Sequence, residues 1–208
     1  MADLEWTNVA GSTHAGGRGT CDFVFVCTGN RFRSALAEAV FRRETADADV
    51  RVQSFGTLRL DQLPALPEAV DLARAHGVDL SQHRCRSLVG EDLRDADLVV
   101  GFELMHAATA VLNASASRDR TFLLSELVAY LDLLPPTADG TPKGARRAVE
   151  AAAALRSEHR LTVEEIADPL GRPAKVQARI AADVAAQTSR LALHLFGAGM
   201  QSGSGRAN

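Results

Sequence analysis

The chain has 208 residues, of which 46% are hydrophobic, and a formal net charge of −3 at pH 7. This length and composition suit one domain with a sizeable core, and the small negative charge gives no electrostatic reason to expect nucleic acid as a partner. Three cysteines without paired spacing exclude a disulfide framework or a zinc site, and they favour a reducing, cytoplasmic setting. No apolar run is long enough to span a bilayer, so we expect no membrane partner.

The folded domain is expected to cover residues 21–197, because the segments outside it, 1–20 and 198–208, have the polar, glycine-rich composition typical of disorder. Short apolar runs predict four buried strands, at residues 23–26, 50–55, 96–102 and 120–124. Helical periodicity predicts six helices, at residues 34–44, 67–76, 103–113, 125–134, 145–159 and 173–196, and a short helical turn at 90–93. Strands that alternate with helices predict a doubly wound parallel α/β sheet.

Residues 27–34, CTGNRFRS, lie directly after the first predicted strand and lead into the first predicted helix. In doubly wound sheets, ligands bind at the carboxyl ends of the strands, where this segment lies. A helix N-terminus and a nearby arginine both lower the pKa of a thiol, which a cysteine nucleophile requires. The backbone N–H groups of such a loop can also face inward and hold an anion. The segment therefore predicts a cup for a phosphate-sized anion, with the Cys27 sulfur at its base.

The side chains of this loop fit that prediction. Gly29 permits a turn that a Cβ would hinder, and Asn30 tolerates a left-handed backbone. Arg33 can bind two phosphate oxygens with its guanidinium fork. Ser34 can donate its hydroxyl hydrogen to the Cys27 sulfur and stabilise the thiolate. The alternative is an inert buried thiol at the end of a strand.

The string VCTGNRFRSALAEAVFR resembles the active-site loop and first helix of the low-molecular-weight protein tyrosine phosphatases. Further segments agree in order, namely SFGT (54–57), DLSQHRCRSL (79–88), DLRDADLVVGF (92–102), FLLSEL (122–127) and ADPLG (167–171). The resemblance implies the family's flavodoxin-like phosphatase fold, a single-domain α/β structure with a four-stranded parallel sheet and helices on both faces. It also implies hydrolysis of a phosphomonoester through a phosphocysteine, with phosphotyrosine protein as the default substrate.

The resemblance assigns roles to individual residues. Cys27 attacks phosphorus, Arg33 stabilises the equatorial oxygens, and Asp168 protonates the leaving oxygen and then activates water. The other loop residues expected to bind phosphate are Thr28, Gly29, Asn30, Arg31, Phe32 and Ser34. No cofactor and no metal are implied. Taken alone, Asp168 is better explained as a helix N-cap or a turn residue before Pro169, and the Cys27 loop is what favours the acid role.

Two departures from the family concern the loop itself. Phe32 stands where a second cysteine usually lies, so a protective disulfide with Cys27 is lost unless Cys21 or Cys85 substitutes. Arg31 stands where tyrosine phosphatases often have an apolar residue and the bacterial protein arginine phosphatase has threonine. We expect its side chain either to point away into solvent or to make an extra anion contact.

A third departure concerns the cleft walls, which lack the aromatic residues usual in the family. Candidate substrate contacts there are Arg59, Leu60, Leu170 and Arg172. Ring stacking on phosphotyrosine is therefore in question. This leaves phosphoarginine or a small anionic phosphorylated metabolite as the alternative substrate. Two further functions stay open, namely arsenate reduction and phosphate binding without catalysis.

Residues 131–160 form a longer stretch than the family needs before Asp168. We expect this insertion to form a helical flap beside the active site, or an association surface that supports a homodimer. The alternative is a solvated decoration. His83 and His106 have no partners at metal-ligand spacing, so structural hydrogen bonds are predicted for both.

Overall fold

The computed structural model describes residues 19–135 and 139–197, so the segments 1–18 and 198–208, predicted to be disordered, lie outside the described residues. The strands are β1 (Cys21–Cys27), β2 (Val50–Gly56), β3 (Leu98–Gly101) and β4 (Thr121–Leu123). The helices are α1 (Arg33–Glu44), α2 (Pro67–Ala75), α3 (Leu104–Asn113), α4 (Leu124–Leu133), α5 (Pro142–Glu158) and α6 (Ala174–Phe196), and a 3₁₀ turn, η1 (Arg118–Arg120), precedes β4. None of these helices is long and apolar enough to cross a membrane.

The four strands form one parallel sheet in the order β2-β1-β3-β4, which confirms the predicted doubly wound α/β fold. In register, Cys27 pairs with Gly56 of β2, and Val26 pairs with Gly101 of β3. The carboxyl ends of these strands therefore meet at one edge, where parallel α/β sheets bind ligands.

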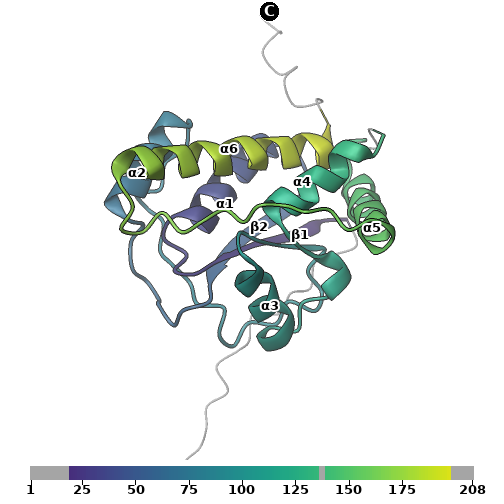
Figure 1. Cartoon of the computed structure of the whole chain (residues 1–208), viewed down its shortest axis with the longest axis horizontal. Helices are drawn as coiled ribbons and strands as arrows, with labels where there is room; N and C mark the ends of the chain where they lie inside the picture. Colours follow the sequence, from purple (N-terminus) through teal and green to yellow (C-terminus); the bar gives the residue numbers. More distant parts are fainter. Residues whose placement is uncertain (1–18, 136–138, 198–208) are drawn as a thin grey trace, which may run out of the picture.

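Alternation along β1 divides the core between the two faces of the sheet. Phe23 and Phe25 point to the face covered by α1, α4, α5 and α6, where both rings pack against Phe41 of α1. Val24 and Val26 point to the opposite face, which α3 covers (Figure 1). Because successive side chains of a strand alternate, a strand buried on both faces must be apolar throughout, as this one is.

The predicted helical turn at residues 90–93 is wrong. These residues have irregular backbone, and Gly90 has a φ of +90°, which a right-handed helix does not contain. The other predicted strands and helices are present, with ends that differ by a few residues. For example, β3 starts at Leu98 rather than at residue 96.

The predicted flap beside the active site is also wrong, because α5 lies at the opposite end of the sheet. Its small apolar residues, among them Ala145 and Ala148, are buried in the main core. Arg146 of this helix binds the carboxylate of Asp97, just before β3, at 2.8 and 3.1 Å, and the carbonyl of Thr20, just before β1, at 2.7 Å. The helix thus packs near the amino ends of the strands (Figure 1). Self-association through the insertion stays a prediction.

Residues 159–168, which we call the strap, connect α5 back to the carboxyl edge of the sheet. The Tyr130 hydroxyl of α4 donates to the carbonyl of His159 at 2.7 Å. Further along, the Ile166 amide donates to the carbonyl of Phe102, just after β3, at 2.9 Å. The strap is therefore fixed at both ends, and its last residue is held at the edge where Cys27 lies.

Candidate active site

The Cys27 sulfur lies at the base of a turn between the last residue of β1 and the first turn of α1. It is buried, 3.0 Å from the Ser34 Oγ and 3.3 Å from the Asn30 amide nitrogen, which donates to it. The Ser34 oxygen accepts a hydrogen bond from the Asn30 side-chain amide at 2.9 Å, so its own hydrogen is available to the sulfur. Two donors that converge on one sulfur stabilise its thiolate form.

Asn30 holds the shape of the loop. It is fully buried with a φ of 52°, the left-handed conformation predicted for it. Its side-chain amide also donates to Ser54 Oγ at 2.7 Å, and its side-chain oxygen accepts from the Arg86 amide at 2.8 Å. Its carbonyl accepts from His83 Nε2 at 2.7 Å. Because three chain segments bind this one residue, hydrogen bonds within the protein fix the loop conformation without a ligand.

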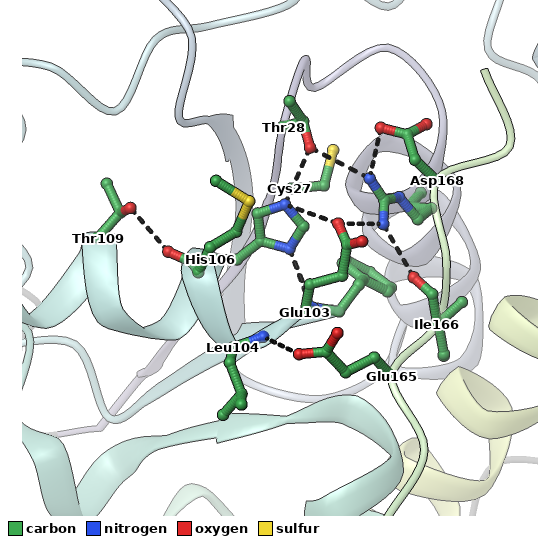
Figure 2. Close-up of polar contacts among 12 residues, drawn as sticks. Cys27, Thr28, Glu103, Leu104, His106, Thr109, Glu165, Ile166 and Asp168 are labelled. Atoms are coloured by element: carbon green, nitrogen blue, oxygen red, sulfur yellow. Dashed lines mark hydrogen bonds and ion pairs between the residues drawn. The ribbon is translucent and has the colours of Figure 1, made fainter. Parts of the chain in front are cut away.

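Arg33 connects the loop to the segment just after β3 and to the strap, and its side chain is almost completely buried. Its Nη1 donates to Glu103 Oε2 and to the Ile166 carbonyl, each at 2.8 Å. Its Nη2 donates to Asp168 Oδ2 at 2.8 Å and to Thr28 Oγ1 at 3.2 Å (Figure 2). The Nη1 side is thus an anchor to the protein, whereas Nη2 faces the loop and Asp168.

His106 completes this network as a neutral donor. Its Nδ1 accepts from the amides of Glu103, at 3.1 Å, and Phe102, at 3.4 Å, so the ring proton must lie on Nε2. Nε2 is 3.0 Å from Thr28 Oγ1 and 3.4 Å from Glu103 Oε2. Burial, and secondarily the charge of Arg33, lower the pKa of His106 to about 4. The structural hydrogen bonds predicted for this residue are confirmed, and the described part of the chain contains no group of three or more metal-ligand residues.

Glu103, Ile166 and the Thr28–His106 contact were not foreseen from the sequence. One signal was available, because Glu103 and His106 follow the third predicted strand at the edge where Cys27 follows the first. The carboxyl ends of neighbouring parallel strands lie side by side, so polar residues after both strands are candidates for one site.

The apolar lining of the cavity above Cys27 consists of Phe32 from the loop and of leucine side chains. The loop forms one side, and Asp168 forms another with four leucines, namely Leu58, Leu60, Leu66 and Leu170. Leu60 and Leu170 were predicted to lie there, whereas Leu58 and Leu66 were not. The predicted contacts Arg59 and Arg172 are exposed and are not part of the lining.

Arg31 is among the residues that line this cavity. Its Nε donates to the Pro64 carbonyl at 2.7 Å, and its own carbonyl accepts from the Leu66 amide at 3.0 Å. Within residues 19–135 and 139–197, no carboxylate forms an ion pair with Arg31. Arg31 is therefore a lining residue whose side chain is tethered to Pro64, and among the described residues no carboxylate neutralises its charge.

The three cysteines are all free and buried. Cys21 and Cys27 are the first and last residues of β1, about 20 Å apart along the strand. Burial raises the pKa of the Cys21 thiol to about 12, and its sulfur donates to the Pro142 carbonyl at 3.2 Å. The Cys85 sulfur donates to the Leu60 carbonyl at 3.3 Å. Cys21 therefore cannot replace the missing loop cysteine while the strand is intact.

Comparison with known proteins agrees with this site. The sequence signature of the family described as low molecular weight phosphotyrosine protein phosphatase matches residues 22–143. The low molecular weight protein-tyrosine-phosphatase Etp of Escherichia coli is 34% identical over 111 residues, which are 53% of this chain and 74% of that protein. The protein-arginine-phosphatase of Bacillus subtilis is 34% identical over 119 residues, 55% of this chain and 79% of that protein.

Comparison with solved structures indicates the same family. A low molecular weight protein tyrosine phosphatase from T. tengcongensis superimposes with a TM-score of 0.61 at 27% identity, over 83% of this chain and 97% of that chain. The chain belongs to the low molecular weight phosphotyrosine protein phosphatase family, and it is an enzyme of the phosphatase class. The matched signature ends at residue 143, before the strap and Asp168.

Proposed function

We propose that this chain hydrolyses phosphotyrosine in proteins, with Cys27 as nucleophile, Arg33 as phosphate ligand and Asp168 as general acid and base. The observation that carries the proposal is the convergence of these three residues on one cavity. The sulfur receives hydrogen bonds from the loop, and Arg33 and Asp168 are within hydrogen-bond distance of each other.

In the first step, the Cys27 thiolate attacks phosphorus while the bond to the leaving oxygen breaks. Asp168 gives its proton to that oxygen, so the product leaves as a neutral phenol. The inward backbone N–H groups of the loop, the N-terminus of α1 and the Arg33 guanidinium stabilise the charge on the equatorial oxygens. The electron pair of the broken bond stays with the leaving oxygen.

In the second step, Asp168 takes a proton from water, and the water oxygen attacks the phosphorus of the phosphocysteine. The sulfur–phosphorus bond breaks, and the electron pair returns to sulfur as a thiolate. The Ser34 hydroxyl and the Asn30 amide stabilise this thiolate as a leaving group. The products are inorganic phosphate and the starting enzyme.

The cavity walls favour an aryl phosphate over phosphoarginine. The leucine side chains around the entrance can pack on a flat ring without aromatic stacking. The tethered guanidinium of Arg31 repels the cationic guanidinium of phosphoarginine and attracts a carboxylate beside the phosphorylated residue. We therefore place phosphotyrosine with acidic neighbours ahead of phosphoarginine.

The test is initial rates on 4-nitrophenyl phosphate between about pH 5 and 8, without added metal, for wild type, Cys27→Ser and Cys85→Ser. We expect turnover by wild type and Cys85→Ser and none by Cys27→Ser. We then compare kcat/KM on a phosphotyrosine peptide and on a phosphoarginine peptide of otherwise identical sequence to identify the preferred substrate. Equal activity of Cys27→Ser and wild type contradicts the thiolate mechanism, and a preference for the phosphoarginine peptide contradicts the substrate assignment.

A further inference from the structure

Thr28 follows the nucleophile directly, and its side chain lines the cavity. Its Oγ1 has two polar neighbours from the protein side, namely His106 Nε2 at 3.0 Å and Arg33 Nη2 at 3.2 Å (Figure 2). Arg33 can only donate. The direction of the contact with His106 is set by the other ring nitrogen.

His106 can only donate to Thr28 in this arrangement. Its Nδ1 faces the backbone N–H groups of Phe102 and Glu103, so it must accept there. A neutral ring then carries its hydrogen on Nε2, which lies nearer to Thr28 Oγ1 than to Glu103 Oε2, at 3.0 against 3.4 Å. The Thr28 oxygen thus accepts two hydrogen bonds, which occupy both of its lone pairs.

The hydroxyl hydrogen of Thr28 is consequently free to be donated. Within the described ranges, 19–135 and 139–197, no protein acceptor for it lies within hydrogen-bond distance. Asp168 Oδ2 and Thr28 Oγ1 both contact Arg33 Nη2, so the hydroxyl lies beside the position where an anionic oxygen already binds.

We propose that the Thr28 hydroxyl is a catalytic hydrogen-bond donor to a phosphoryl oxygen of the substrate, and that His106 is the residue that positions it. This inference rests on the proposed function for the reaction, but phosphate binding alone also tests it. A buried neutral histidine suits this role because it orients the hydroxyl without adding a second charge beside Arg33. The donor adds to the loop N–H groups, whose charge stabilisation grows as the phosphoryl group is transferred.

The first experiment compares Thr28→Val, which keeps the shape but removes the hydroxyl, with Thr28→Ser, which keeps it. The readouts are the dissociation constant of inorganic phosphate by calorimetry on the full chain, and kcat/KM on 4-nitrophenyl phosphate. We expect Thr28→Val to bind phosphate about tenfold more weakly and to lose about ten- to a hundredfold in kcat/KM, with Thr28→Ser retaining most of both. Wild-type phosphate affinity in Thr28→Val overturns the proposal.

Failure of the proposed function is distinguishable, because an inactive wild type still reports phosphate affinity. The same measurement separates a direct donor from a residue that only holds Arg33. In an Arg33→Lys background, a direct donor still loses phosphate affinity on Thr28→Val. A Thr28 that acts only through Arg33 loses none, and that outcome overturns the proposal.

The role of His106 is tested with His106→Asn, whose side-chain oxygen can keep the contact with the Glu103 amide but whose amide cannot reach Thr28. We expect weaker phosphate binding and a reduced kcat/KM, with no further loss when Thr28→Val is added. Effects of the two substitutions that do not add indicate that His106 and Thr28 act through the same interaction. Additive losses in the double variant overturn the positioning role of His106.

Discussion

Arg33 and Asp168 are separated by 135 positions in the sequence, yet Nη2 of the first donates to Oδ2 of the second at 2.8 Å. Arg33 is almost completely buried, and its Nη1 side is held by Glu103 and Ile166. The Asp168 oxygen therefore occupies a position on the guanidinium that we assign to a phosphoryl oxygen. Substrate has to displace this carboxylate, which is then free to turn toward the leaving group.

Asp168→Ala should therefore separate catalysis from binding. We expect kcat to fall about 10²- to 10⁴-fold because the general acid is lost. Phosphate should bind more tightly than to wild type, because a competing anion has been removed from Arg33. The measurements are kcat on phenyl phosphate and on 4-nitrophenyl phosphate, and the inhibition constant of inorganic phosphate.

The loss in kcat should be larger for phenyl phosphate, whose leaving group needs protonation more. Glu165→Gln is the matched control, since this carboxylate lies on the same strap and caps the Leu104 amide without contacting Arg33. Weaker phosphate binding in Asp168→Ala would show that the ion pair does not compete with substrate.

Arg31→Met should change the substrate preference of the enzyme. We expect kcat/KM for a phosphotyrosine peptide with flanking aspartates to fall about tenfold, because an uncompensated cation at the cavity wall is lost. A peptide with flanking lysines should not lose activity. The matched control is Arg59→Met, an exposed arginine outside the cavity lining. Equal losses on both peptides contradict recognition of acidic neighbours.

Arg146→Ala should reduce stability without affecting the reaction. This side chain is 29% exposed and binds Asp97, which is 15% exposed, so its loss should lower the free energy of unfolding by about 1–3 kcal/mol. The control is Arg147→Ala, whose ion pair with Asp139 is far more exposed, at 49% and 44%, and should matter little. Urea unfolding and kcat are measured together. A lower kcat in Arg146→Ala would mean that the insertion influences the active site after all.

His106 should make the protein less stable in mild acid. Its pKa is lowered from 6.5 to about 4 in the folded chain, so between these values the unfolded chain binds a proton that the native chain does not. The free energy of unfolding therefore falls as the pH drops below about 6.5 and levels off below about 4. Between pH 7 and pH 5 this residue should account for about 2 kcal/mol. Urea unfolding of wild type and His106→Asn at both pH values checks this, and an equal drop in the two proteins contradicts it.

The sheet was predictable from the sequence because its signals are local. A continuous apolar strand such as residues 23–26 indicates burial on both faces of the sheet. Strands that alternate with helices are compatible with few sheet topologies. The left-handed Asn30 was predictable for a similar reason, since few residue types tolerate that conformation. The prediction of a helical turn at residues 90–93 was wrong because a short segment with no periodicity does not constrain its backbone conformation.

Tertiary contacts were not predictable in the same way. The partners of Arg33 just after β3 and on the strap are 70 and 133 positions away. The position of Glu103 after a predicted strand makes it a candidate for the site, but no local pattern shows that its partner is Arg33. The helical character of α5 was clear from its composition, but composition does not tell which end of the sheet a helix covers. Only packing places α5 at the amino ends of the strands.

Tyr130 is the single tyrosine of the chain, and its side chain is 1% exposed, with the hydroxyl bound to the start of the strap. A kinase that modifies tyrosine needs the side chain in an extended, accessible segment, which the folded chain does not provide. With phosphotyrosine as the proposed substrate, the folded enzyme therefore presents no accessible tyrosine to a second copy of itself or to a tyrosine kinase.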